Sequence, residues 1–302
     1  MLSKGDFERG WQAYENRWNI NDYDILLGKR FFRVPLWLGK ETIKGKTILL
    51  YGEQGLGDFI QFSRYAKLVA DMGAKVILET PESLFELMKN LAGVSQLVMK
   101  GQELPPFDYQ CPLLSLPLAM KTTLATIPTA GSYLRSNCEK VNRWQLRLGE
   151  KRKKRVGIAW SSTSGFKNDA LRSLKLDDFV KALPPEEFEY ICLQKELKEQ
   201  DREFFQGYKN IQFYGQELNN LDDTAALIEC IDLVVSTCTS IPHLSAALGK
   251  ETWILLSYVP DWRWLLDRED SPWYPSVRLF RQQLIGDWNG VLERVREELS
   301  LI

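Results

Sequence analysis

Histidine is almost missing from this chain, which carries only His243 among its 302 residues. A metal site built on two or more imidazoles is therefore excluded. The five cysteines are scattered and odd in number, and no two of them form a Cys-x-x-Cys pair. This pattern argues against a disulfide framework or a zinc site and indicates a reducing, cytoplasmic environment.

Long apolar runs and a signal peptide are also missing. No stretch approaches the ~18 apolar residues of a membrane span, and the N-terminus carries Lys4, Asp6, Glu8 and Arg9 where a signal peptide would be apolar. Neither sign of charge dominates, since 39 Lys and Arg residues face 40 Asp and Glu residues. We therefore expect a cytoplasmic protein without stable membrane insertion and without general affinity for nucleic acid.

The chain alternates strand and helix patterns in two successive series. In the first, a strand at 47–51 leads into a helix at about 58–72, and in the second the pattern restarts with a strand at 155–160. Strands separated by helices of this length imply parallel pairing through right-handed crossovers. Between the series, the charge run 150–155 indicates a solvated surface or a linker. The sequence thus predicts two α/β halves in tandem, each a twisted parallel sheet.

Both ends of the chain lie outside these series. Residues 3–18 form an amphipathic helical pattern whose aromatic residues recur at helical spacing. One such helix cannot bury its aromatic face alone, so it either docks on the body of the protein or continues a helical repeat array. The predicted segments are an N-terminal helix and connector (1–45), two domains (46–140 and 155–285) and a C-terminal helix (286–302).

A glycine-rich loop, Tyr51–Asp58, follows the first strand and precedes the first helix. Its glycines allow close backbone approach, and a helix N-terminus offers unpaired N–H groups to a polar ligand. The spacing of the glycines matches neither G-x-G-x-x-G nor a P-loop, because no Gly-Lys-Ser/Thr follows. Asp58 stands at the expected N-cap, where it is either a helix cap or a catalytic carboxylate.

Two hydroxyl-rich loops mark the second half. The loop after its first strand carries Ser161, Ser162, Thr163, Lys167 and Arg172. Hydroxyls and cations of this kind bind the oxygens of a diphosphate, although a polar surface loop would have the same composition.

The other loop, 236–240, ends a strand in hydroxyl residues and opens directly into a helix, with Pro242 suited to its first turn. Thr239 and Ser240 would then lie at a helix N-terminus that favours anions. His243 in the same turn is either structural or a donor to phosphate.

An aromatic loop, 258–275, contains three tryptophans and two tyrosines together with Asp261 and Arg263. Trp262 and Trp264 of this loop are suited to a sugar-binding platform. They are equally suited to a hydrophobic seam between the two domains, and the residues alone leave both interpretations open.

The glycine loop and the residues that follow it, Ile60-Gln61-Phe62 and Arg64-Tyr65, resemble a bacterial glycosyltransferase-like domain found after tetratricopeptide repeats. Those domains are related to the ADP-heptose:lipopolysaccharide heptosyltransferases and more distantly to O-GlcNAc transferase. Further blocks in the same order extend the resemblance over about residues 45–285: Val156–Trp160, Arg172-Ser173, Thr239-Ser240 with His243-Leu244, Ala247–Gly249 and Val259–Trp264. Residues 3–18 resemble the last helix of the preceding repeat array.

The resemblance implies a GT-B fold, in which two Rossmann-like domains face each other across a cleft and the final helix packs toward the first domain. It implies inverting, metal-independent transfer from a nucleoside-diphosphate sugar, without a cofactor, to a glycan or protein acceptor. Asp58 would be the general base. The implied diphosphate-binding residues are Ser161, Ser162, Thr163, Lys167, Arg172, Thr239, Ser240 and His243. The implied acceptor or cleft residues are Gln54, Gly55, Gly57, Trp262 and Trp264.

The chain departs from the family pattern at Cys238, where an aspartate is usual, and at Pro242, which replaces a small residue. The only Asp-x-Asp, Asp22-Tyr23-Asp24, lies outside the α/β pattern, which argues against a metal-dependent glycosyltransferase. A sugar-nucleotide epimerase or hydrolase on the same fold stays an alternative. A non-catalytic module that binds a protein partner through the N-terminal helix is another. The sequence names neither the sugar, the nucleobase nor the acceptor.

Overall fold

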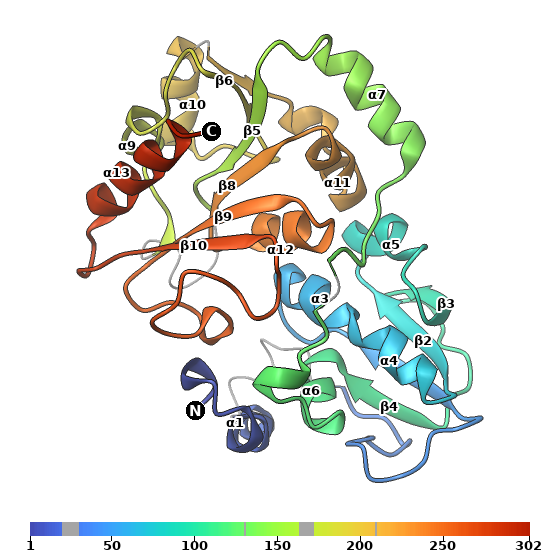
Figure 1. Ribbon diagram of the computed structural model, residues 1–302. Helices are drawn as coiled ribbons and strands as arrows, with labels where there is room; N and C mark the ends of the chain where they lie inside the picture. Colours follow the sequence, from blue (N-terminus) through green and yellow to red (C-terminus); the bar gives the residue numbers. More distant parts are fainter. Residues whose placement is uncertain (20–29, 130, 163–171, 209) are drawn as a thin grey trace. The chain divides into compact units, whose positions relative to one another are not determined.

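The structure, a computed structural model, describes residues 1–19, 30–129, 131–162, 172–208 and 210–302. The chain divides into two compact units, Met1–Arg135 and Ser136–Ile302 (Figure 1). The second unit begins earlier than the predicted second domain, because a helix that the sequence analysis did not anticipate, α7 (Cys138–Leu148), belongs to it.

The first unit is built on a four-stranded parallel sheet of order β3-β2-β1-β4. Its strands are β1 (Thr47–Tyr51), β2 (Lys75–Thr80), β3 (Val94–Met99) and β4 (Tyr109–Pro112). Its main helices are α3 (Leu56–Ser63), α4 (Tyr65–Asp71), α5 (Glu82–Met88) and α6 (Leu116–Ala119). The four residues 48–51 of β1 are all buried, as the central strand of a sheet covered on both faces requires.

The N-terminal segment is part of this first unit. It consists of a 3-10 turn, η1 (Leu2–Lys4), the helix α1 (Phe7–Tyr14) and a second 3-10 turn, η2 (Glu15–Asn19). Phe7 and Trp11 are each only 2% exposed, and the indole of Trp11 donates to the carbonyl of Thr122 at 2.9 Å. The aromatic face thus docks on the body of the first unit. The expectation that this face receives a protein partner is not supported.

The second unit contains a six-stranded parallel sheet of order β10-β9-β8-β5-β6-β7. Its strands are β5 (Lys154–Ala159), β6 (Phe188–Cys192), β7 (Ile211–Phe213), β8 (Leu233–Thr237), β9 (Glu251–Leu256) and β10 (Val277–Arg281). Besides α7, its helices are α9 (Leu176–Lys181), α10 (Glu199–Gly207), α11 (Leu221–Glu229), α12 (Ser240–Ala247) and α13 (Trp288–Leu299). Helices α9, α10 and α13 lie on one side of the sheet and α11 and α12 on the other (Figure 1).

Two predictions about this unit need correction. The charge run 150–155 is not wholly a linker, because Lys154 and Arg155 begin β5 and the buried Arg155 pairs with Glu189 at 2.8 Å. The C-terminal helix was expected to pack toward the first domain. Its apolar face, Val291, Leu292, Val295 and Leu299, is instead part of the core of the second unit. An amphipathic pattern indicates that one face of a helix is covered, but it does not indicate which domain covers that face.

Candidate functional site

The glycine loop connects β1 to α3 in the first unit. The helix begins at Leu56, two residues earlier than predicted, with Gly55 as N-cap. Asp58 therefore is not the N-cap but the third helical residue, and its Oδ2 accepts a hydrogen bond from the Gly55 N–H at 2.9 Å. Asp58 is half-buried, and its capping role is established by this bond.

Close packing explains two of the glycines. A Cβ on Gly52 would lie 2.5 Å from Cδ2 of Phe59, and one on Gly55 would lie 3.2 Å from Oδ2 of Asp58. A side chain at position 52 would require the loop or the Phe59 ring to move, and one at position 55 would require the Asp58 carboxylate to shift by a few tenths of an ångström. The expected cleft residues Gln54, Gly55 and Gly57 are half-buried on the same loop as Asp58.

Glu53, on this loop, is a candidate functional residue that the sequence analysis did not name. Its side chain is fully buried, and its Oε1 accepts from Nη2 of Arg17 at 3.1 Å. Burial raises the pKa of Glu53 to about 7, the Arg17 guanidinium opposes this rise, and the negative charge of Asp58 adds to it. Carboxyl groups with strongly raised pKa values are enriched at functional sites and also occur in structural ion-pair networks such as this one. The available signal was a glutamate two residues after the end of a buried strand.

Arg17 reaches the loop from η2 and holds several groups together. Its guanidinium also donates to Oε1 of Glu15 at 2.6 Å and to Oγ of Ser115 at 2.7 Å. A second hydrogen bond links the same two segments: Nε2 of Gln54 donates to the hydroxyl of Tyr14 at 2.8 Å. The N-terminal segment thus fixes the glycine loop at two neighbouring residues.

In the second unit, the two hydroxyl-rich loops start from adjacent strands. β5 and β8 pair in parallel with Ala159 opposite Ser236, so the segments that follow them leave the same edge of the sheet. The backbone N–H groups of Trp160 and Ser161 both donate to Oε1 of Gln194, at 2.8 and 3.0 Å. The hydroxyl of Ser162 accepts from Nη2 of Arg172 at 3.2 Å. Thr163 and Lys167 lie outside the described residues.

The second of these loops ends at the N-terminus of α12. Thr239 is the N-cap, and its hydroxyl accepts from the Ile241 N–H at 3.3 Å. Ser240 is the first residue of the helix, and both hydroxyl residues are half-buried. A helix start with hydroxyls and N–H groups at a strand end is suited to an anion such as phosphate.

His243 lies in an aromatic cluster. It is 5% exposed, its Nδ1 is 3.0 Å from the hydroxyl of Tyr274, and its ring stacks on Trp264 with centroids 5.1 Å apart. These contacts favour the structural interpretation of His243. The indole of Trp264 donates to Sγ of Cys238 at 3.1 Å, and burial raises the pKa of this thiol to about 11.

Trp264 is correspondingly not a surface platform. It is completely buried and contacts His243 and Cys238, so its assignment as an acceptor or cleft residue does not fit this structure. Trp262 remains half-buried, with the guanidinium of Arg263 at 4.3 Å from its ring. Of the two predicted tryptophans, Trp262 alone keeps partial exposure.

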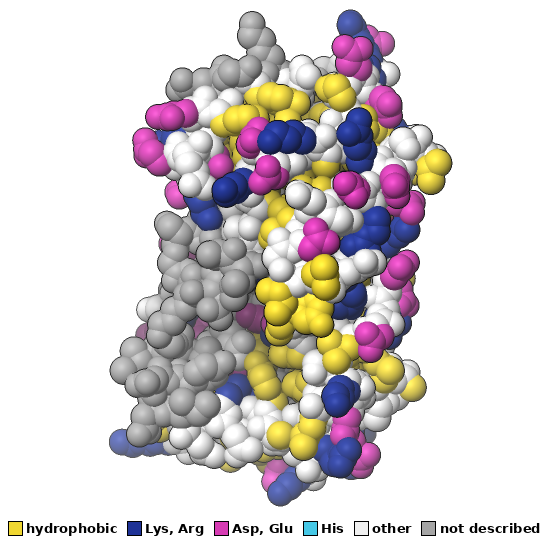
Figure 2. All heavy atoms as spheres, turned by 90° about the vertical axis from the view of Figure 1, so that its left-hand side faces the viewer, with side chains coloured by type: hydrophobic (Ala, Val, Ile, Leu, Met, Phe, Trp, Pro, Cys, Tyr) yellow, Lys and Arg dark blue, Asp and Glu magenta, His cyan; other side chains and the backbone are white. Residues whose placement is uncertain are grey.

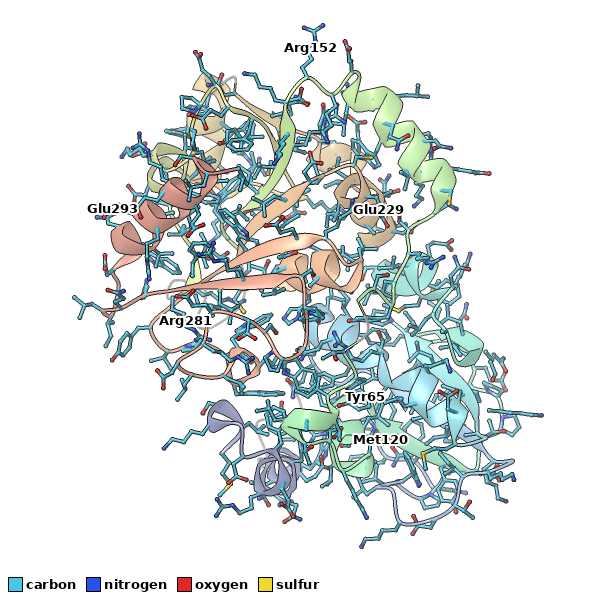
Figure 3. All side chains as sticks on the ribbon, in the orientation of Figure 1. Tyr65, Met120, Arg152, Glu229, Arg281 and Glu293 are labelled. Atoms are coloured by element: carbon cyan, nitrogen blue, oxygen red, sulfur yellow. The ribbon has the colours of Figure 1, made fainter. Side chains whose placement is uncertain are left out.

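Arg281 holds the aromatic loop in place and was also missed. From the end of β10 it donates to three backbone carbonyls, those of Trp264, Leu265 and Arg268, and it lies beside the loop that joins β9 to β10 (Figure 3). Leu265 has a φ of 53°, a conformation that costs a non-glycine residue about 1–3 kcal/mol. Arg281 thus holds a loop whose backbone is strained.

The described residues show neither a cluster of metal ligands nor a membrane-spanning helix. No three His, Cys, Asp or Glu side chains in this part of the chain are grouped as metal ligands. None of the described helices is both long and apolar enough to cross a bilayer. On the face drawn in Figure 2, acidic and basic side chains are interspersed over the residues shown in colour.

The chain is similar in sequence to a curated protein and in structure to several solved proteins. No protein-family model matches the chain. Protein FlbA of Caulobacter vibrioides is 24% identical over 99% of the chain. The chain spans about half of that relative, 53% of its length.

Several solved structures of glycosyltransferases resemble the chain. A glycosyl transferase family 9 protein from Veillonella parvula aligns with TM-score 0.61 and 11% identity, covering 86% of this chain and 98% of that one. The ADP-heptose LPS heptosyltransferase II of E. coli aligns with TM-score 0.60 and 14% identity, covering 84% and 98%. The E. coli heptosyltransferase WaaC with ADP aligns with TM-score 0.51, 11% identity and the same coverage. The predicted α/β GT-B fold is confirmed: the chain shares the fold of family 9 glycosyltransferases and heptosyltransferases.

Proposed function

We propose that this chain transfers a sugar from a nucleoside-diphosphate sugar to an acceptor hydroxyl, with inversion and without a metal ion. The observation that carries this proposal is the juxtaposition of the two hydroxyl-bearing loops after β5 and β8, on a fold shared with heptosyltransferases. In open parallel sheets, ligands bind beyond the carboxyl ends of the strands. One of the solved relatives holds ADP and another ADP-D-beta-D-heptose.

In the proposed reaction the second unit holds the donor. Thr239 and Ser240 would bind the diphosphate at the N-terminus of α12, and Ser161 and Ser162 would bind it from the adjacent loop. The charge on the leaving diphosphate is then balanced by N–H groups, hydroxyls and Arg172.

The first unit would supply the base. Asp58 takes the proton of the acceptor hydroxyl, whose oxygen forms a bond to the anomeric carbon. The bond between that carbon and the diphosphate oxygen breaks, and its electron pair leaves with the nucleoside diphosphate. Attack opposite the leaving group inverts the anomeric centre.

Replacement of Asp58 by asparagine tests the role of the base. An amide oxygen can still accept from the Gly55 N–H, so the fold and nucleotide binding are expected to survive. Transfer should fall by about 10²- to 10⁴-fold, the usual contribution of a general base. Asp223 offers a matched control, because it caps α11 in the same way, accepting from Asn220 N–H at 3.3 Å. Wild-type turnover of Asp58→Asn would refute the assignment.

Donor binding is tested separately by calorimetric titration of the full chain with ADP, GDP, UDP and their sugars. Ser240→Ala should weaken binding of the best nucleotide about three- to tenfold, since a hydrogen bond contributes roughly 0.5–1.5 kcal/mol. Ser300→Ala, at the exposed end of α13, is the control. Binding of none of these nucleotides would reject the proposal, and binding with hydrolysis alone would identify a different enzyme on the same fold.

A further inference from the structure

The buried carboxyl group of Glu53 lies in a network that contains more acidic groups than cations. Arg17 is its salt-bridge partner, and the same guanidinium is shared with Glu15 and Ser115. The other oxygen of Glu53, Oε2, is buried without a hydrogen-bond partner among the residues that the structure describes. Because Arg17 is shared and Oε2 has no described partner, the negative charge of an ionised Glu53 is only partly compensated.

Described residues from several elements interact with Glu53 or with its partner Arg17. They are Arg17 and Glu15 from η2, Tyr51 from β1, Asp58 from α3 and Cys111 from β4. Arg30 acts on the same Tyr51. Burial raises the pKa of Tyr51 and that of Cys111, so both stay neutral and add no charge near pH 7. Among the described residues, the charged groups in this network are Arg17, Glu15 and Asp58, with Arg30 acting on Tyr51.

We infer that Glu53 is a positioning residue: the N-terminal segment holds it against the glycine loop through Arg17, and its negative charge contributes to the electrostatic field at Asp58. The inference rests on the proposed role of Asp58 as the base. Glu53 does not touch the reacting atoms in this scheme. It acts through the loop backbone and through the electrostatic field at Asp58, five residues further along the chain.

The direction of the effect follows from the reciprocity of charge coupling. Because the charge of Asp58 raises the proton affinity of Glu53, an ionised Glu53 raises the proton affinity of Asp58 equally. A carboxylate with higher proton affinity is a stronger base. Transfer should therefore accelerate as pH rises through the titration of Glu53.

Two variants of the full chain separate this role from a merely structural one. Glu53→Gln is permanently neutral, so the acceleration near pH 7 should disappear and kcat at pH 8 should fall about three- to tenfold. Arg17→Met removes the cation that favours ionised Glu53, so the same acceleration should move to higher pH. Glu79→Gln is the matched control, because Glu79 is also 4% exposed and also paired with one arginine, Arg30. It should keep the wild-type profile.

A second measurement needs no turnover. With ¹³C-labelled glutamate carboxyls, the Glu53 resonance is identified by its absence in Glu53→Gln, and its titration midpoint is followed by NMR. Asp58→Asn should lower this midpoint, and Arg17→Met should raise it. An unchanged midpoint in Asp58→Asn would overturn the inference even if the chain is a transferase. A shifted midpoint with no transfer by the wild type would reject the proposed function and leave the coupling intact.

Discussion

The buried carboxyl of Glu53 makes the stability of the first unit depend on pH in an unusual direction. Below its ordinary pKa of 4.5, Glu53 is protonated in both the folded and the unfolded chain. Between 4.5 and about 7 the folded chain keeps a proton that the unfolded chain has released. Stability from this group is thus fully present at low pH and is lost as pH rises through about 7. Most carboxyl groups of folded proteins act in the opposite sense.

The magnitude follows from the pKa values. One pKa unit corresponds to about 1.4 kcal/mol, so a rise from 4.5 to about 7 corresponds to about 3 kcal/mol of unfolding free energy. Glu53→Gln carries no such proton, so the difference in unfolding free energy between Glu53→Gln and the wild type should change by that amount between pH 4.5 and 8. The variant should gain relative to the wild type as pH rises.

Guanidinium unfolding at several pH values measures this difference. Hydrogen exchange of peptides from the first unit assigns the transition to that unit, because a chain with two compact units need not unfold in one step. Glu79→Gln should leave the contribution of Glu53 to the pH dependence in place. A difference between Glu53→Gln and the wild type that stays constant from pH 4.5 to 8 would refute the reasoning.

Three further predictions concern packing and reactivity. Gly52→Ala should lower the unfolding free energy by about 1–3 kcal/mol, because the added Cβ would lie 2.5 Å from the ring of Phe59. Gly131→Ala is the control: a Cβ at this position meets nothing within 4 Å, so the denaturation midpoint should not change. Tyr274→Phe should lower the unfolding free energy by about 1 kcal/mol, because the hydrogen bond between the Tyr274 hydroxyl and His243 is lost. Denaturant unfolding measures this loss, and an unchanged midpoint would argue against that bond. At pH 8 iodoacetamide should modify the exposed Cys138 well before the half-buried Cys238, because the pKa of the Cys238 thiol is raised to about 11. Equal labelling of the two cysteines in peptide mass spectrometry would contradict this raised pKa.

Periodicity and turn residues were sufficient for the sheets and for most helices. The apolar run 47–51 and the glycines after it predicted β1 and its loop, because buried parallel strands read as continuous apolar segments. The start of α3 was misplaced by two residues, because a glycine N-cap has no side chain to reveal it and the capping carboxylate stands three residues later. Local patterns thus located the loop but assigned the wrong cap.

Residues that depend on distant partners were not predictable in this way. The buried salt bridge that singles out Glu53 is formed with Arg17, which is 36 positions away in the sequence. Trp264 was assigned to a ligand surface because an aromatic side chain fits a platform and a core equally well, and only its packing on His243 and Cys238 decides between them. The same holds for Arg281, whose three carbonyl contacts belong to a loop 13 to 17 residues earlier.

The two links from the N-terminal segment to the glycine loop bear on how the chain can be divided. A fragment that began at the predicted domain start, residue 46, would lack Tyr14 and Arg17. It would retain the strand, the glycines and Asp58, but Glu53 would be buried without its counterion and Gln54 without its tyrosine. Such a fragment would be expected to hold a proton on Glu53 at neutral pH and to leave the loop less well fixed. The first nineteen residues therefore belong with the glycine loop in any fragment made to study it.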